Sequence, residues 1–415
     1  MKTLKLIKLL CASVCMAFVA TGVLYAQSPY GWRGAHRDGI YEETGLLKVW
    51  PADGPELLWS ALDAGKGHTS PVIVSDRLYI TGMNEDETRE IFSAYEVAYS
   101  PVWGGSYPET RTTPMIVGKK AFMISGSGEV VCLDITDGKI VWKVSGKSFR
   151  HQPGMWGTSE CPLVIDGKKV IYTPSGNETT IVALDAETGK TIWKSRSLQD
   201  EGGYASPILI TYNGHRKIVA LTGNRIVGVN PENGQIDWTF DDLGKEGSQY
   251  IVPTNTPLYK DGRIFTANGY GAGAFMLQLN EDASGVRLLW RNKGFDPHHG
   301  CFVLVDGIIY GSSHGRNGLG KWMAVDWNTG RTRFEMNWGK GVGEGSVIAA
   351  DGMLYCSDER RGMVGLVRVN PAKFDLVSFF RITRGEGAFW AHPVIHRGIL
   401  YVRHGNALMA YKIKG

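Results

Sequence analysis

The chain has 415 residues and a net charge of +4, with 43% hydrophobic and 21% charged residues. This composition is typical of a folded globular protein, and it excludes a disordered chain, a collagen-like chain and a multi-span membrane protein. The 54 glycines exceed the usual share of about 7%. A nucleic-acid binder needs a strongly basic surface, so this charge predicts no nucleic-acid partner.

Residues 1–26 have the parts of a secretory signal peptide. Three lysines fall within the first eight residues, and an apolar run of 16 residues extends from Leu9 to Leu24. That run is shorter than the about 20 residues needed to span a bilayer. We therefore expect cleavage after Ala26 and a periplasmic or secreted mature protein with no membrane span. An uncleaved N-terminal anchor is the alternative.

The remaining cysteines are widely separated and have no CxxC spacing. This argues against a disulfide framework, a zinc site or a CxxCH haem attachment, and predicts buried free thiols. The four residues are Cys132, Cys161, Cys301 and Cys356.

Short strands flank a glycine turn that recurs every 45 to 49 residues. A second pattern follows in several units, Asp-x-x-Thr-Gly-Lys-x-x-Trp, as in Ala183–Trp193. Cys132–Trp142 has Asp in place of the Thr, and further variants occur at Gly228–Trp238 and Ala324–Phe334. The acid or amide caps the turn, the glycine supplies a positive φ, and the ring can pack between neighbouring sheets. Four short strands every ~45 residues predict the blades of a β-propeller.

Eight such units can be counted, and the last is short. It has room for three strands, whereas Pro55–Ser60 looks like a fourth strand with no blade before it. We predict an all-β, eight-bladed propeller over 55–415, preceded by an N-terminal segment, 27–54. Pro55–Ser60 should complete the last blade and bury Leu57, Leu58 and Trp59. The acidic stretch Asn84–Glu90 interrupts the first unit and predicts a three-stranded or distorted first blade. The blades begin near His68, Arg111, Thr158, Ala205, Thr254, Gly300, Gly345 and Ala391.

The Asp-x-x-Thr-Gly-Lys-x-x-Trp turns resemble the PQQ-like (pyrroloquinoline-quinone-like) repeat, over Pro55 to Tyr411. That family includes the eight-bladed quinoprotein alcohol dehydrogenases and the outer-membrane assembly protein BamB. The opening Trp32–Gly39 resembles the start of a secreted subgroup. The repeat implies a fold and leaves the chemistry open.

For the quinone enzymes, the resemblance implies PQQ held between a tryptophan and a ring made by two adjacent cysteines, beside a calcium ion bound by carboxylate and amide oxygens. This chain has no Cys-Cys pair, and only Glu160 and Asn255 are isolated calcium candidates. PQQ with calcium is therefore disfavoured as a cofactor.

Residues just before the innermost strand of each blade converge on the propeller axis. Many of them are aromatic or polar, a combination that suits a saccharide, and a cation among them would suit an acidic sugar. We assign four other tryptophans to packing between sheets and not to ligand binding: Trp142, Trp193, Trp238 and Trp290. Clustered histidines would titrate near neutral pH, so binding should change between pH 5 and 8. Because the repeat does not set their distances, no metal site is assigned. The ligand-binding candidates are His68, Arg111, Trp156, Glu160, Tyr204, Tyr250, Asn255, His298, His299, Glu344, Trp390 and His392.

The sequence thus favours a protein that binds a small polar ligand, a saccharide being the class considered, at the axial funnel. It identifies no catalytic residue, and an enzyme using His and Tyr as acid and base stays open. Two alternatives are a BamB-like scaffold for an envelope protein partner and a PQQ-dependent alcohol or sugar dehydrogenase.

Overall fold

The computed structural model describes residues 31–243, 252–315, 320–339 and 343–415. Over these ranges the chain forms 34 strands and a single short 3-10 helix, Gly146–Phe149. No helix in the described ranges is long and apolar enough to cross a membrane. The expected signal peptide, 1–26, lies outside the described residues.

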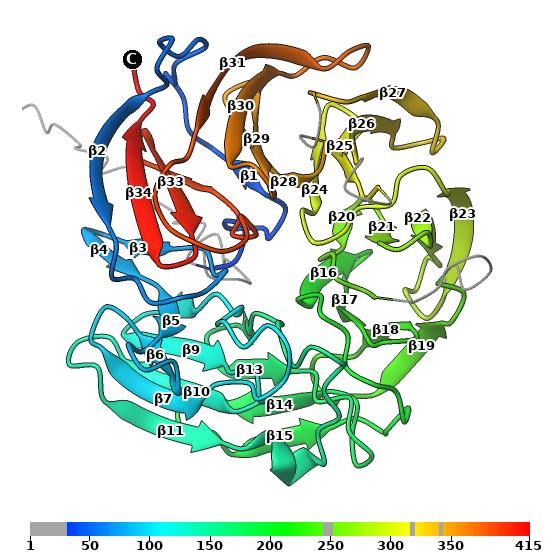
Figure 1. Ribbon diagram of the computed structural model, residues 1–415. Helices are drawn as coiled ribbons and strands as arrows, with labels where there is room; N and C mark the ends of the chain where they lie inside the picture. The colour runs from blue at the N-terminus through cyan, green and yellow to red at the C-terminus, as the bar shows by residue number, and fades with distance from the viewer. Residues whose placement is uncertain (1–30, 244–251, 316–319, 340–342) are drawn as a thin grey trace, which may run out of the picture.

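Five sheets follow the predicted plan of four consecutive antiparallel strands, and they lie one after another around a ring (Figure 1). First strands of neighbouring sheets contact one another, as β8 does with β12 and β12 with β16. The last strand of each sheet lies on the rim. The five sheets are β8 (Met115–Val117), β9 (Lys120–Ile124), β10 (Val130–Asp134) and β11 (Ile140–Val144); β12 (Leu163–Ile165), β13 (Lys169–Tyr172), β14 (Val182–Asp185) and β15 (Thr191–Lys194); β16 (Ile208–Tyr212), β17 (His215–Leu221), β18 (Ile226–Val229) and β19 (Ile236–Phe240); β20 (Leu258–Lys260), β21 (Arg263–Asn268), β22 (Gly273–Leu279) and β23 (Val286–Asn292); β24 (Phe302–Val305), β25 (Ile308–Ser313), β26 (Lys321–Asp326) and β27 (Thr332–Met336).

The remaining sheets are the irregular ones, and each departs from the plan differently. One gains a parallel strand from the N-terminal segment, one receives its outer strand from that segment, and the first unit is split into two small sheets. They are β28 (Gly345–Ala350), β29 (Met353–Asp358), β30 (Met363–Arg368) and β31 (Asp375–Arg381) with β1 (Ile40–Tyr41); β32 (Val394–His396), β33 (Ile399–His404) and β34 (Ala407–Lys412) with β2 (Glu56–Ala61); and β3 (Val72–Val74) and β4 (Arg77–Tyr79) followed by β5 (Thr81–Met83), β6 (Arg89–Phe92) and β7 (Val97–Pro101).

The repeated turns join neighbouring sheets at the rim. In the turn after β14, the backbone N–H and the hydroxyl of Thr188 both donate to Asp185 Oδ1, at 2.8 Å. Gly189 in the same turn has a φ of +71°. Trp142 on the preceding sheet donates its Nε1–H to the Ala186 carbonyl at 3.1 Å. Its ring covers Gly189 so closely that a Cβ there would come within 2.8 Å of it. The turn glycine is therefore required both by its dihedral angle and by the ring above it.

The same contact recurs at two other sheet boundaries, which confirms the packing role predicted for Trp142, Trp193 and Trp290. Each ring lies over a turn glycine of the next sheet, and its Nε1–H donates to a carbonyl of that turn. The further pairs are Trp193 with Gly234 and Pro231, and Trp290 with Gly330 and Trp327. Trp238 is also buried in a core, over Gly228, but its Nε1–H has no hydrogen-bond partner among the described residues.

The first unit is distorted, as predicted. Ile80 separates β4 from β5, so the expected second strand is broken and the two parts belong to different sheets. Within the acidic stretch, Asn84 Oδ1 accepts hydrogen bonds from the backbone N–H groups of Thr88 and Arg89, at 3.0 and 2.8 Å. This side chain replaces the Asp-Thr-Gly turn of the other units.

The N-terminal strand pairs with the last sheet, as predicted. β2 is antiparallel to β34, with Trp59 opposite Ala410. The predicted burial of Leu57, Leu58 and Trp59 is wrong, since these side chains are 36%, 43% and 42% exposed. β2 is the outermost strand of its sheet, so the face away from β34 meets solvent.

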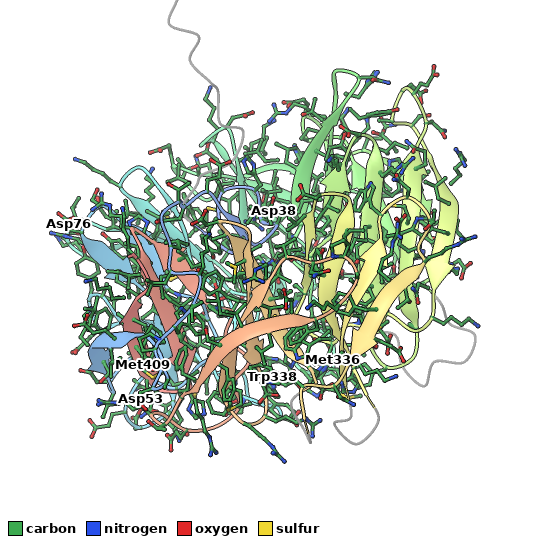
Figure 2. All side chains as sticks on the ribbon, turned by 90° about the horizontal axis from the view of Figure 1, so that it is seen from above. Asp38, Asp53, Asp76, Met336, Trp338 and Met409 are labelled. Atoms are coloured by element: carbon green, nitrogen blue, oxygen red, sulfur yellow. The ribbon has the colours of Figure 1, made fainter. Side chains whose placement is uncertain are left out.

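Other apolar side chains of the N-terminal segment, which precede β2 in the sequence, are buried. Leu46 and Trp50 are buried in the core between the sheet of β28 and the sheet of β34. Asp38 lies in the upper half and Asp53 in the lower half of Figure 2, so the segment crosses from one face of the ring toward the other. It is therefore part of the folded ring and contributes to its core.

Two buried arginines bind this segment to the inner ends of the sheets. The Arg33 guanidinium donates to the carbonyls of Val347 and Phe302, at 3.3 and 2.6 Å. The Arg37 guanidinium donates to the carbonyls of Cys161 and Pro207, at 3.2 and 3.0 Å. Arginine offers five donors in a rigid fork, so a single side chain can satisfy carbonyls from two sheets.

Candidate functional site

A cavity of about 220 Å³ is lined by residues that precede the first strands of many different sheets. Eight of the twelve sequence candidates line it, although they span residues 68 to 392. The convergence follows from the ring, because first strands gather at its centre. The eight are His68, Arg111, Trp156, Tyr204, His298, His299, Trp390 and His392.

Three other candidates are buried at the sheet ends and do not line the cavity. Thr173 donates its backbone N–H to Glu160 Oε1 at 3.0 Å. The Asn255 amide group donates to the carbonyls of Ala267 and Pro297, both at 2.9 Å, and its Oδ1 accepts from Cys301. Both side chains therefore hold backbone in place.

Glu344 is also engaged, in an ion pair with Arg360 at 2.9 Å and a contact of 3.1 Å with His314 Nδ1. The fourth missing candidate, Tyr250, lies outside the described residues.

Several lining residues were not predicted, and Trp32 is the most informative of them. It belongs to the N-terminal segment, and its Nε1–H donates to Thr256 Oγ1 at 3.2 Å. Its ring meets His392 edge-on, with centroids 4.6 Å apart. The motif that begins at Trp32 was visible in the sequence, but it lies outside the repeat and its position could not be inferred. The other unpredicted lining residues are Tyr107, Ser159, Cys161, Ser206, Val252, Thr254, Thr256 and Tyr270.

Arg111 gives the cavity a positive charge. Its Nε and Nη2 atoms are buried without a hydrogen-bond partner, and no carboxylate of the described residues forms an ion pair with it. Burial lowers the pKa of Arg111, and the nearby Glu90 carboxyl acts in the opposite direction. Because guanidinium groups stay protonated in proteins, the cavity presents donors suited to an anionic group.

The expectation that the cavity histidines titrate near neutral pH is wrong. Burial, assisted by the neighbouring Arg403 guanidinium, lowers the pKa of His68 to about 3. Burial lowers the pKa of His299 to about 4, and the pKa values of His298 and His392 fall well below the usual range for the same reason. Between pH 5 and 8 these rings are neutral, so protonation of these histidines cannot make binding change over that range.

The tautomer of His392 is fixed by its partners. Arg33 Nη1 lies 2.9 Å from His392 Nδ1, and His392 Nε2 lies 2.9 Å from the carbonyl oxygen of His299. Because a guanidinium can only donate, Nδ1 accepts and Nε2–H donates to His299. The N-terminal segment thus positions the backbone of a cavity residue through His392.

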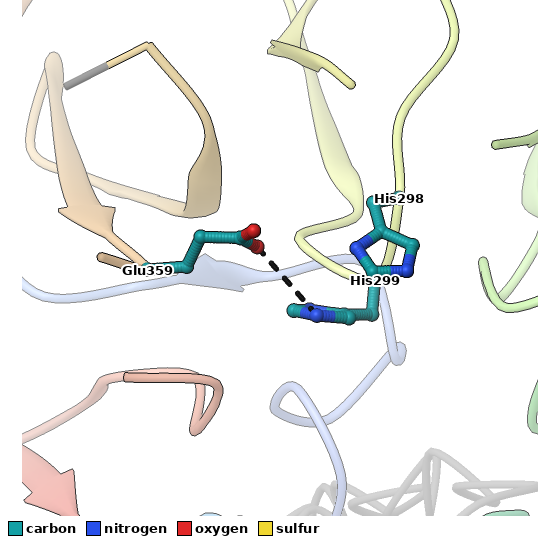
Figure 3. Close-up of side chains that lie close together, drawn as sticks. All are labelled: His298, His299 and Glu359. Atoms are coloured by element: carbon teal, nitrogen blue, oxygen red, sulfur yellow. Dashed lines mark ion pairs between the residues drawn. The ribbon is translucent and has the colours of Figure 1, made fainter. Parts of the chain in front are cut away.

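His298, His299 and Glu359 bring three potential metal-binding groups together (Figure 3). Their ligand atoms all lie within 4.8 Å of one another, and His299 Nε2 is 3.5 Å from Glu359 Oε2. Burial and the nearby Glu344 carboxyl raise the pKa of Glu359 above its ordinary value. The two histidines precede β24 and Glu359 follows β29, so the group joins two adjacent sheets.

The residues do not fit the PQQ and calcium site implied by the family resemblance. Cys132, Cys161, Cys301 and Cys356 are separate buried free thiols, as predicted, and no two of them are adjacent in sequence. The Asn255 amide is fully engaged with backbone. Glu160 is buried, does not line the cavity, and already accepts the backbone N–H of Thr173 at 3.0 Å.

Comparisons with known proteins support the repeat over most of the chain. A sequence model of the family described as outer membrane protein assembly factor BamB matches residues 56–336. A polyvinylalcohol dehydrogenase of a Pseudomonas species is 24% identical over 72% of this chain and 47% of its own length. This chain spans about half the length of the first curated relatives it matches.

Solved structures show the same β-propeller fold. BamB from Moraxella catarrhalis superposes with a TM-score of 0.61 at 16% identity, covering 86% of this chain and 99% of BamB. A quinohemoprotein alcohol dehydrogenase from Comamonas testosteroni superposes with a TM-score of 0.66 at 13% identity, covering 95% of this chain and 82% of the dehydrogenase. At such identities the likeness concerns fold alone.

Proposed function

This chain belongs to the PQQ-like repeat family, whose model it matches over residues 56–336, and from that premise we propose that it binds a small polar ligand in its axial cavity. The proposed class is a saccharide that carries a carboxylate. The repeat supplies only the scaffold, so the chemistry must come from the residues at the axis.

The observation that carries this proposal is the combination of groups in one cavity. Trp156 and Trp390 offer flat apolar faces, and neutral histidine rings offer hydrogen-bond partners. Arg111 supplies a cation without a carboxylate partner among the described residues. Sugar rings bind by stacking on such faces while their hydroxyl groups bond to polar edges, and a carboxylate would pair with the guanidinium.

We interpret the ring as eight blades. In this reading β3 to β7 form one interrupted blade, and β2 completes the blade of β32 to β34. This pairing joins the two ends of the chain in one sheet and covers the outer edge of β34. We also propose periplasmic or secreted localisation, on the basis of the signal-like residues 1–26.

Calorimetric titration with D-glucuronate and D-glucose tests the ligand proposal. Glucuronate should bind more tightly than glucose, and Arg111→Ala should weaken glucuronate binding by at least about tenfold, because a charge-assisted hydrogen bond contributes roughly 1.5–3 kcal/mol. Arg287→Ala, at an exposed position on β23, is the matched control and should bind like the wild type. Equal loss in both variants, or no preference for the acid, would argue against the cavity as the site.

A BamB-like scaffold for an envelope protein partner is the second candidate function. Leu58, Trp59 and Leu62 are 43%, 42% and 56% exposed, and Trp59 and Leu62 line a cleft of about 720 Å³. Exposed apolar side chains that lie together mark interaction surfaces. A photocrosslinker at Leu62 should capture one envelope protein in cells, and a crosslinker at Arg287 should not; equal capture at both positions would remove this candidate.

A PQQ-dependent dehydrogenase is the third alternative, and the cavity residues disfavour it. Purified protein mixed with PQQ and calcium should show no dye-linked oxidation of alcohols or aldoses. Stoichiometric PQQ uptake with turnover would favour the dehydrogenase over the ligand-binding and scaffold functions.

A further inference from the structure

His298, His299 and Glu359 form a group whose donors suit a transition metal. Two imidazoles and one carboxylate make up the donor set. His298 and His299 also line the axial cavity, so a metal bound between them would be accessible to a ligand there. Glu359, directly after β29, approaches His299 from the neighbouring sheet (Figure 3).

A second, independent observation is the state of the ring nitrogens. His298 Nδ1 and His299 Nε2 are both buried and have no hydrogen-bond partner. The other nitrogen of His298, Nε2, lies 2.9 Å from the Tyr270 hydroxyl. Buried polar atoms in native proteins are normally paired, so two orphaned nitrogens in one group call for a bound species.

We propose that His298 Nδ1, His299 Nε2 and a carboxylate oxygen of Glu359 bind one divalent transition-metal ion of the zinc type. This inference goes beyond the proposed ligand-binding function and does not depend on the identity of that ligand. Two imidazoles and a carboxylate form a common three-residue zinc site, in which a further position stays open.

The observed distances are close to those of a zinc site. Two ligands about 2.1 Å from a tetrahedral zinc ion lie about 3.4 Å apart, and His299 Nε2 is 3.5 Å from Glu359 Oε2. All three ligand atoms of the group lie within 4.8 Å of one another. Calcium is disfavoured, because hard cations take oxygen ligands and two of the three donors are nitrogen.

The hydrogen-bond partners of the proposed metal-binding residues support the metal site as well. Metal-binding histidines commonly donate their second ring N–H to an outer partner, and Tyr270 stands in that position for His298. His392 holds the backbone of His299 through its carbonyl. Glu344 is already paired with Arg360, which leaves Glu359 as the carboxylate for the metal.

Cobalt(II) binding tests the proposal directly, because coordination by nitrogen and oxygen gives visible d–d absorption bands. The full-length protein is treated with EDTA, desalted and titrated with Co²⁺ alone, and then with Zn²⁺ as competitor. We expect one cobalt per chain, displaced by one zinc. His299→Ala and Glu359→Gln should lose roughly 100-fold or more in affinity, and Tyr270→Phe about tenfold. His215→Ala, an exposed histidine at the start of β17, should bind cobalt normally.

Circular dichroism of each variant shows whether it is folded, and Glu359→Gln keeps the volume of the side chain if an alanine variant fails. The proposal is overturned if the wild type gives no d–d bands, if His299→Ala binds like His215→Ala, or if Ca²⁺ displaces the cobalt more readily than Zn²⁺. Titration of the EDTA-treated wild type with glucuronate tests the ligand-binding function separately, so the two proposals can fail independently.

Discussion

The rim turns and the axial ends of the sheets occupy equivalent positions in the regular repeats, yet they behave differently. At the rim the same residues recur with the same contacts, as Trp142 over Gly189 and Trp193 over Gly234 illustrate. At the axis, equivalent positions carry His68, Arg111 and other unlike residues. Repetition thus marks the parts that hold sheets together, and loss of repetition marks the part available for function.

The two regions also satisfy their polar groups differently. The rim tryptophans Trp142, Trp193 and Trp290 each donate to a turn carbonyl, and Trp238, whose Nε1–H is unpaired among the described residues, is the exception. At the axis, atoms of His68 and Arg111 are buried without partners. Unpaired buried groups lower stability, and their retention at a cavity is typical of binding sites.

The largest expected effect comes from removing the segment that crosses between the two regions. Deleting residues 27–62 removes β2 together with the buried Leu46, Trp50, Arg33 and Arg37. Each large buried apolar side chain contributes about 1.5–3 kcal/mol, so the melting temperature should fall by roughly 10 °C or more. A chain beginning at residue 31 is the control for differential scanning calorimetry. If the deletion melts like the control, the segment is not part of the ring core.

A matched pair of tryptophans distinguishes rim from axis. Trp193→Ala removes a buried ring from a sheet boundary and should destabilise the protein by about 3–5 kcal/mol. Trp156→Ala removes a half-buried cavity ring and should cost less stability while weakening saccharide binding. Urea unfolding and calorimetric titration measure the two effects, and equal losses of stability would contradict the division between regions.

Acid should lower the stability of the protein through the buried histidines of the axis. The pKa of His68 is about 3 in the folded protein and about 6.5 when unfolded, so only the unfolded chain binds that proton between these values. Its contribution to the free energy of unfolding is complete above about pH 6.5 and falls by about 1.4 kcal/mol per pH unit below it.

Glu160 has the opposite effect on the free energy of unfolding. Its pKa is raised to about 8 in the folded protein, so its contribution to stability grows as the pH falls from about 8 to 4.5. Comparing His68→Gln with the wild type isolates the histidine contribution, since both chains keep Glu160. Urea unfolding at several pH values from 7 to 4 should give a shallower loss for His68→Gln. Parallel curves would mean that His68 is protonated in the folded protein.

The smallest effect should come from a single rim turn. Asp185→Ala removes the acceptor for Thr188 and should cost about 1 kcal/mol, without changing ligand or cobalt binding. Thermal unfolding measures this loss. A change in the cavity from so distant a turn would show that rim and axis are coupled.

The sequence by itself determined the repeat, its spacing, the distorted first unit, the pairing of the N-terminal strand and eight of the cavity residues. These follow from local rules: alternation of apolar residues, turn chemistry and equivalent positions in successive units. Glu160, Asn255 and Glu344 could not be separated from the true lining residues, because a one-residue change in register turns a side chain from the axis to the sheet end.

Only the tertiary structure decided what fills the centre of the ring. Trp32, Arg33 and Arg37 lie outside the repeat, so no periodicity gives their position. Trp32 donates to a threonine hydroxyl 224 residues away, and the two arginines donate to backbone carbonyls 314 and 170 residues away. The approach of Glu359 to His299 likewise depends on how two neighbouring sheets are placed. Burial of the histidines, and with it their low pKa values, also arises only when the ring closes around them, because desolvation depends on the complete three-dimensional surroundings of a side chain.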